Sequence, residues 1–316
     1  MQVFNQYFMP AVIERYPQMI NQFNAASGGC LRLEAAGFDG NFEQASFYKN
    51  MFSTGRRVNR YGANSDVNAT PLSQGLHNIV KVAGGFGPVS YEPSQMTWLR
   101  KPTQEGVTLF AEQFSQYLLA DQLNTVIASA VAAIGNNADA TNDISATAGL
   151  SHAALNATDA KFGDHSDMLQ CRIMSGMAKH LLIGENISNQ GRLFTAGNVS
   201  VLDVSGKIAV VTDAPALYDG TDQANPLLKV LTLVPSGGVV RDGSDIITNI
   251  ETSNGKQRIE TTMQSDYSFG VGLKGYSWDD TISSPTDAQL ATGANWTNVE
   301  SSVKHTAGVL TICKAE

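Results

Sequence analysis

The amino-acid sequence predicts an α+β fold that combines one long helix with many short strands. Three observations predict it. Residues 103–134 carry the longest run of apolar residues at helical spacing. Residues 141–234 alternate between helical and strand patterns, and strand patterns dominate from about residue 227 onward. The 316 residues are enough for two ordinary domains, or for one elongated chain with extensions.

The composition is that of a chain with unusually few charges. Charged residues make up 16% of the sequence, against a usual share of about 25%. Such a surface suits contact with other protein, although a loop-rich protein of low charge is an alternative. The net charge is -8, and the 21 Lys and Arg residues form no long basic stripe. The sequence therefore argues against strong direct binding of nucleic acid.

Three cysteines, Cys30, Cys171 and Cys313, lie far apart in the sequence. Such a set is not a disulfide framework and contains no CxxC spacing for zinc, which predicts synthesis in a reducing compartment. The N-terminus lacks the basic start and long apolar run of a signal peptide. No window approaches about 18 uninterrupted apolar residues, so we expect no membrane span.

The N-terminal third predicts an arm followed by a long hairpin. Residues 3–24 have apolar residues near helical spacing, interrupted by Pro10 and Pro17, which predicts one or two short amphipathic helices. A glycine-punctuated turn around a short strand follows at residues 25–42. Residues 41–100 have β-rich ends and a polar, Asn- and Gly-rich middle with little core material. A stretch of this length is unusual inside a compact domain, so we expect a projecting hairpin that packs against something else.

The middle of this hairpin contains a short basic cluster, Arg56, Arg57 and Arg60. One interpretation is a solvated loop. The other is a clamp between protein subunits, because guanidinium groups pair bidentately with carboxylates of a neighbouring copy. The sequence leaves both interpretations open.

Residues 103–134 predict a long spine helix. Pro102 precedes it, Thr103 can cap its first turn, and Gly135 ends it. The apolar residues of its first half lie along one face of the helix, and those of its second half lie along a face rotated about the helix axis. At about 1.5 Å per residue the helix would be roughly 45 Å long.

Residues 152–171 place two His, three Asp and one Cys within a short stretch. One hypothesis is a metal-dependent hydrolase that uses His152, Asp164 and His165. The two histidines, however, do not have the i, i+4 spacing of a helical metal site, and a predicted helix end separates them. The alternative is structural: a short helix, a turn and the start of a buried strand.

In the structural alternative, each polar residue has a local role. We expect Ser151 to cap a helix that Gly163 ends, and Asp159 on that helix to face solvent. Asp164 is expected to hold its own backbone at a turn, and Cys171 to be a small buried residue of a strand. The chain has no phosphate-binding loop, no GxSxG elbow and no HExxH motif. We therefore expect no catalytic, cofactor-binding or metal-binding residues.

Four segments of the chain resemble the major capsid (coat) proteins of tailed double-stranded DNA bacteriophages, which have the Hong Kong 97-type fold. They are FNAASGG at 23–29, the spine segment at 111–134, the segment ALNATDAKFGDHSDMLQCRIMSGMAKHLLI at 154–183, and VVTDAPAL at 210–217. Their order and spacing are more specific than any one of them. The resemblance covers most of the chain and is weakest near the C-terminus.

The resemblance implies a domain organisation. Residues 1–40 correspond to an N-terminal arm, and residues 41–100 to an E-loop that lies over a neighbouring subunit. Residues 101–140 and 235–316 correspond to the peripheral (P) domain with the spine helix. Residues 141–234 correspond to the axial (A) domain.

The resemblance also implies a structural function and a set of partners. Copies of the chain assemble into hexamers and pentamers of an icosahedral phage head, with weak non-specific contact to the enclosed double-stranded DNA. Separate scaffolding and portal proteins and an optional decoration protein are the other partners, with synthesis in the bacterial cytoplasm and no membrane. The start at Met1 without a long helical prefix adds to the expectation of a separate scaffold. The candidate subunit-interface residues are Arg56, Arg57, Arg60, Asp164 and His165. The alternative is an encapsulin-type bacterial nanocompartment shell, which shares the fold.

Overall fold

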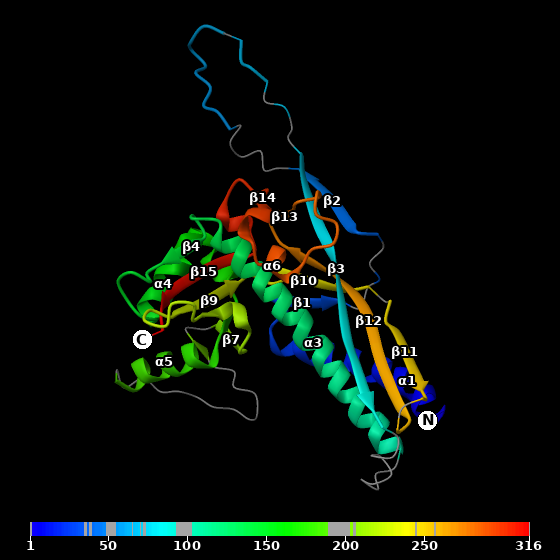
Figure 1. Ribbon diagram of the computed structural model, residues 1–316. Helices are drawn as coiled ribbons and strands as arrows, with labels where there is room; N and C mark the ends of the chain where they lie inside the picture. The colour runs from blue at the N-terminus through cyan, green and yellow to red at the C-terminus, as the bar shows by residue number, and fades with distance from the viewer. Residues whose placement is uncertain are drawn as a thin grey trace.

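Two β-sheets, two long helices and a projecting hairpin make up the chain (Figure 1). The computed structural model describes residues 2–34, 37, 40–48, 55–64, 66–69, 71, 74–92, 103–188, 203–204, 207–243, 245–255 and 257–315. In chain order the elements are α1 (Gln2–Ala26), β1 (Leu31–Glu34), β2 (Phe42–Tyr48), β3 (Gln74–Tyr91), α3 (Thr103–Gly135), β4 (Thr141–Asp143), α4 (His152–Asp159), the 3-10 helix η2 (Ala160–Met168), β5 (Cys171–Met174), α5 (Gly176–Ser188), β6 (Asp203–Val204), β7 (Lys207–Val211), η3 (Pro215–Leu217), β8 (Tyr218–Asp219), β9 (Leu227–Leu233), β10 (Gly238–Asp242), β11 (Ile247–Ser253), β12 (Glu260–Leu273), β13 (Tyr276–Trp278), α6 (Asp287–Leu290), η4 (Gly293–Asn295), β14 (Trp296–Asn298), η5 (Val303–His305) and β15 (Gly308–Lys314).

The predicted hairpin is confirmed, and its base belongs to the chain's own sheet. Strands β2 and β3 pair antiparallel, from Phe42 opposite Val80 to Tyr48 opposite Gln74. Strand β3 also pairs antiparallel with β12 along most of its length. Both strands belong to an eight-stranded sheet with the order β1-β10-β12-β13-β14 and β11, β3 and β2 beside that path. The described residues between β2 and β3 (55–64, 66–69 and 71) extend beyond the sheet (Figure 1).

A second, seven-stranded sheet has the order β4-β15-β9-β5-β7-β6, with β8 paired to β9. Its C-terminal strand β15 pairs antiparallel with β9 and parallel with β4. The last strand of the chain therefore lies among strands from residues 141–234. The seven-stranded sheet therefore includes a strand from beyond residue 235, where the resemblance placed the end of the A domain.

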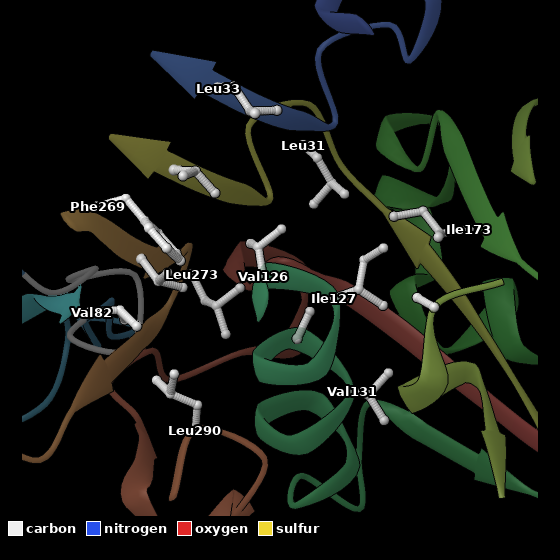
Figure 2. Packing of buried hydrophobic residues seen from close by; sticks show 14 of the residues in the cluster. Leu31, Leu33, Val82, Val126, Ile127, Val131, Ile173, Phe269, Leu273 and Leu290 are labelled. Carbon is white, nitrogen blue, oxygen red and sulfur yellow. The ribbon is translucent and has the colours of Figure 1, made fainter. Parts of the chain in front are cut away.

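The predicted spine helix is confirmed as α3, and its C-terminal half is buried between the two sheets. Val126, Ile127 and Ile134 are all buried. Figure 2 shows Val126 on the side of Leu31 and Leu273, and Ile127 on the side of Ile173. A helix covered on two sides needs apolar residues on two stripes, which explains the rotated apolar pattern.

Helix α3 is also long and apolar enough, over Ala111–Gly135, to cross a membrane by length and composition alone. Half of that window is buried inside the protein, as in the core helix of a folded domain. The side chain of Thr103 lies outside the described side chains, so its predicted capping role is not tested.

The N-terminal segment forms one continuous helix of 25 residues, α1, which is longer than the one or two short helices that its prolines suggested. Pro10 and Pro17 both lie inside it. The helix packs along α3 through Val12, Tyr16 and Ile20, which are buried. An interior proline weakens a helix by a lost hydrogen bond and a steric clash, and packing of the apolar face offsets that cost.

Candidate functional site

The basic cluster lies at the tip of the hairpin, where the described residues 55–64 are all exposed. Arg56, Arg57 and Arg60 are exposed, and none of them forms an ion pair with a described residue. The same loop exposes apolar side chains: the relative solvent exposure is 101% for Tyr61 and 65% for Val58. Large exposed apolar side chains in one place are typical of an interaction surface. The tip of the hairpin is therefore a candidate subunit-contact site.

The helix at residues 152–159 has the predicted start but not the predicted end. The Ser151 hydroxyl accepts a hydrogen bond from the Ala154 backbone N–H at 3.1 Å, which confirms the cap. The α-helix ends at Asp159, before Gly163, and continues as the 3-10 helix η2. Gly163 has φ 57° inside that stretch and marks a kink there instead of the helix end.

Asp159 is buried, so the expectation that it faces solvent is wrong. Its Oδ2 accepts from Arg172 Nη2 at 2.6 Å and from Lys207 Nζ at 2.7 Å. The Arg172 side chain is only 1% exposed and comes from β5, whereas Lys207 comes from β7. A carboxylate at a helix C-terminus meets an unfavourable helix dipole, and the two cations compensate for it. Asp159 thereby ties α4 to the seven-stranded sheet.

A second buried polar group beside Asp159 is absent from the sequence-based predictions. The Thr158 hydroxyl lies 2.8 Å from that of Thr311 on β15, and it accepts from Asn142 Nδ2 at 3.0 Å. Residues far apart in the sequence form this contact, so no local pattern marks it.

Asp164 and His165 both face the short helix η5 of their own chain. The Asp164 carboxylate accepts a hydrogen bond from Lys304 Nζ, and this bond holds the pKa of Asp164 below its usual value. The main partner of the carboxylate is thus a distant side chain, and a weaker hydrogen bond from its own backbone N–H adds to it, in line with the predicted turn role. The His165 ring packs edge-on against His305, with ring centroids 6.0 Å apart.

An open cleft of about 410 Å³ lies beside this pair of contacts. It is lined by Asp139, Lys161, Asn298, Ser301, Ser302, Val303 and Lys304. Asp164 is exposed beside it, so this group of polar residues is open to solvent.

The structure does not bring together the residues of the hydrolase hypothesis. Over the described ranges, no three His, Cys, Asp or Glu side chains lie close enough to hold a metal ion. These ranges include His152, Asp164 and His165. The backbone N–H of His152 donates to Glu185 Oε2 at 2.8 Å, and Asp164 is paired with Lys304. The hypothesis of a metal-dependent hydrolase that uses these residues is therefore wrong.

Cys171 is buried in β5, as predicted. Cys30 and Cys313 are buried as well, and all three cysteines are free thiols.

Comparison with solved structures identifies the fold. The head of Helicobacter pylori bacteriophage KHP40 matches with a TM-score of 0.55 and 10% identity, covering 93% of this chain and 89% of that chain. The capsid of cyanophage Pam1 matches with a TM-score of 0.54 and 12% identity, covering 90% and 88%. The holo-SrpI encapsulin complex of Synechococcus elongatus matches with a TM-score of 0.51 and 8% identity, covering 90% and 85%. The chain thus has the Hong Kong 97-type fold, and this likeness alone does not separate phage heads from encapsulins.

The comparison with protein families separates the two kinds of shell. None of the curated proteins compared matches the chain. The family model described as major capsid protein 13-like (Gp13-like) matches residues 1–310. The encapsulin alternative is therefore the weaker one. The chain belongs to the Gp13-like family of major capsid proteins: it is a structural protein of the icosahedral bacteriophage head, a self-assembling component of the virion and not an enzyme.

Proposed function

We propose that this capsid protein forms hexamers and pentamers around double-stranded DNA, and that the tip of its hairpin clamps a neighbouring subunit. The proposal of a clamp rests on the exposure of the hairpin tip. Arg56, Arg57 and Arg60 stand there beside the exposed Val58 and Tyr61. Guanidinium groups can pair with carboxylates of the neighbour while the apolar side chains lose contact with water.

The domain division follows the two sheets in this proposal. Residues 1–40 form the N-terminal arm and residues 41–100 the E-loop. Residues 101–140 and most of 235–316 form the P domain, and residues 141–234 the A domain. We group strand β15 with the A domain, because it pairs with β9 and β4.

Asp164 and His165 are proposed as a second subunit contact. They lie with Lys304 and His305 beside an open cleft. Such a mixture of opposite charges and rings suits a polar interface rim. In the assembled head this group faces a neighbouring copy.

The other partners follow from the capsid role. A separate scaffolding protein, a portal and an optional decoration protein accompany assembly in the bacterial cytoplasm. Contact with packaged DNA is weak and non-specific, because a chain of net charge -8 repels a polyanion.

Charge reversal at the hairpin tip tests the clamp. The triple variant R56E/R57E/R60E should fold normally, because these side chains are exposed and form no ion pair with a described residue, but it should fail to form shells. The triple variant R56K/R57K/R60K keeps the charge and loses the bidentate geometry, so we expect an intermediate yield. Electron microscopy and sedimentation count the shells, and circular dichroism checks the fold. Normal shells from the charge-reversed variant would show that the clamp does not exist.

A further inference from the structure

The turn that leads into β1 rests on the second sheet of the molecule. This turn, Ser27–Cys30, joins α1 to the first strand of the eight-stranded sheet. Gly28 has φ 64°, and a Cβ atom there would lie 2.8 Å from Cδ1 of Ile208 on β7. The Cys30 thiol donates to the carbonyl oxygen of Leu233 on β9 at 3.8 Å. The turn therefore contacts β7 and β9 of the seven-stranded sheet.

Cys171 lies directly between these two contacts. It is the first residue of β5, which runs between β9 and β7. Cys171 pairs with Leu233 on one side and with Ile208 on the other. Leu233 and Ile208, both contacted by the turn, are thus the two strand neighbours of Cys171, which places the thiols of Cys30 and Cys171 against each other.

The two thiols interact directly and are shielded from solvent. A hydrogen bond from Cys171 lowers the pKa of Cys30. Both cysteines are 0% exposed and belong to one apolar cluster. Cys313 packs in a different cluster, where its thiol points to the carbonyl oxygen of Leu228 at 3.6 Å. The chain thus contains one pair of neighbouring cysteines and a third that serves as a matched control.

We propose that Cys30 and Cys171 form a disulfide bond when the protein meets a peroxide oxidant, linking the turn before β1 to the seven-stranded sheet. The Cys30 thiolate attacks an oxygen of hydrogen peroxide, which gives a sulfenic acid and, with the proton released by the thiol, one water. The Cys171 sulfur then attacks the sulfenic sulfur, and a second water leaves as the S–S bond forms. Two thiols are oxidised and one peroxide is reduced, so atoms and electrons balance.

The bond would add a covalent cross-link between two sheets that also meet through packing and hydrogen bonds. Strand β1 belongs to the eight-stranded sheet and β5 to the seven-stranded one. A link between residues 30 and 171 also closes a long loop in the unfolded chain, which favours the folded state. If assembly takes place in the bacterial cytoplasm, as proposed above, the thiols stay reduced during assembly, and the bond stabilises the head after release.

Peptide mapping of the purified full chain tests the bond. The protein is treated with hydrogen peroxide, its remaining thiols are alkylated in denaturant, and it is digested without reductant. Mass spectrometry should detect two peptides joined through Cys30 and Cys171, and dithiothreitol should separate them. Cys313 should be found in its alkylated form. Recovery of alkylated Cys30 and Cys171, or of separate sulfonic acids, would overturn the proposal.

Stability measurements with matched variants give a second readout. Oxidation should raise the urea midpoint of the wild-type chain and of C313A, and leave the midpoints of C30A and C171A unchanged. If oxidation raised the urea midpoint equally in all four proteins, the Cys30–Cys171 bond would not be the cause of the rise. If C30A fails to fold, the peptide map of C313A still decides. Both readouts use the unassembled chain, so they are independent of whether hexamers and pentamers form.

Discussion

At the scale of single residues, burial separates residues that the sequence makes look alike. Asp159 and Asp164 lie five positions apart in a polar stretch. Asp159 is 7% exposed and pairs with two cations, whereas Asp164 is exposed and pairs with Lys304. A buried carboxylate depends on its partners, because desolvation makes an unpaired charge costly.

The Asp159→Asn variant should lower the free energy of unfolding by about 3–5 kcal/mol, because it leaves the buried Arg172 without its carboxylate. Urea denaturation of the unassembled chain measures this loss. The control is Asp164→Asn, whose carboxylate is exposed, and it should have no measurable effect on stability. Equal losses in the two variants would mean that the buried ion pair does not stabilise the fold.

At the scale of elements, packing keeps helices intact where local rules would end them. Helix α1 runs through Pro10 and Pro17 because its buried face lies along α3. One buried hydrogen bond joins the two helices: the Tyr16 hydroxyl donates to Gln122 Oε1 at 2.6 Å. Burial raises the pKa of Tyr16, so the hydroxyl stays protonated and remains a donor.

The Tyr16→Phe variant tests this contact between helices. It leaves the Gln122 oxygen buried without a donor, which should cost about 1–3 kcal/mol of stability. Tyr117 provides the control, because its exposed hydroxyl donates to the Gly85 carbonyl at 3.3 Å. Tyr117→Phe should change the free energy of unfolding by less than about 0.5 kcal/mol. Thermal and urea unfolding of the two variants should rank them in this order; the reverse order would contradict the role of Tyr16.

At the scale of the whole molecule, the chain combines a buried core with a surface that suits other protein. Helix α3 packs against both sheets, and the C-terminal strand β15 belongs to the seven-stranded sheet. The hairpin tip projects from this body with no buried residue among residues 55–64. A shell subunit needs this division, because it must be stable by itself and also bury surface against several neighbours.

The net charge predicts weak contact with DNA. Near physiological salt, the purified chain should not retain double-stranded DNA in a gel-shift assay, because a chain of net charge -8 gains little from counterion release. The same assay at low salt shows any weak electrostatic contact. Tight binding with a steep salt dependence would instead indicate a basic surface that directly holds the DNA.

Much of the fold could be predicted from local patterns in the sequence. The spine helix, the hairpin and the Ser151 cap follow from spacing and residue type, and the structure confirms each. The charge pattern also predicted an exposed Arg56–Arg60 loop, although its role as a clamp stays a prediction. Asp159 and the Cys30–Cys171 pair could not be predicted, because their partners lie on other elements.

Local patterns in the sequence predict where most helices and strands form, because apolar periodicity and turn residues act within a few positions. The sequence by itself also determined the low charge and the absence of catalytic motifs, which agree with a capsid protein. The three-dimensional packing was needed to show which sheet β15 joins, which carboxylate is buried, and which thiols meet. These depend on contacts between residues more than a hundred positions apart or on different elements, and such contacts leave no periodic trace in the sequence.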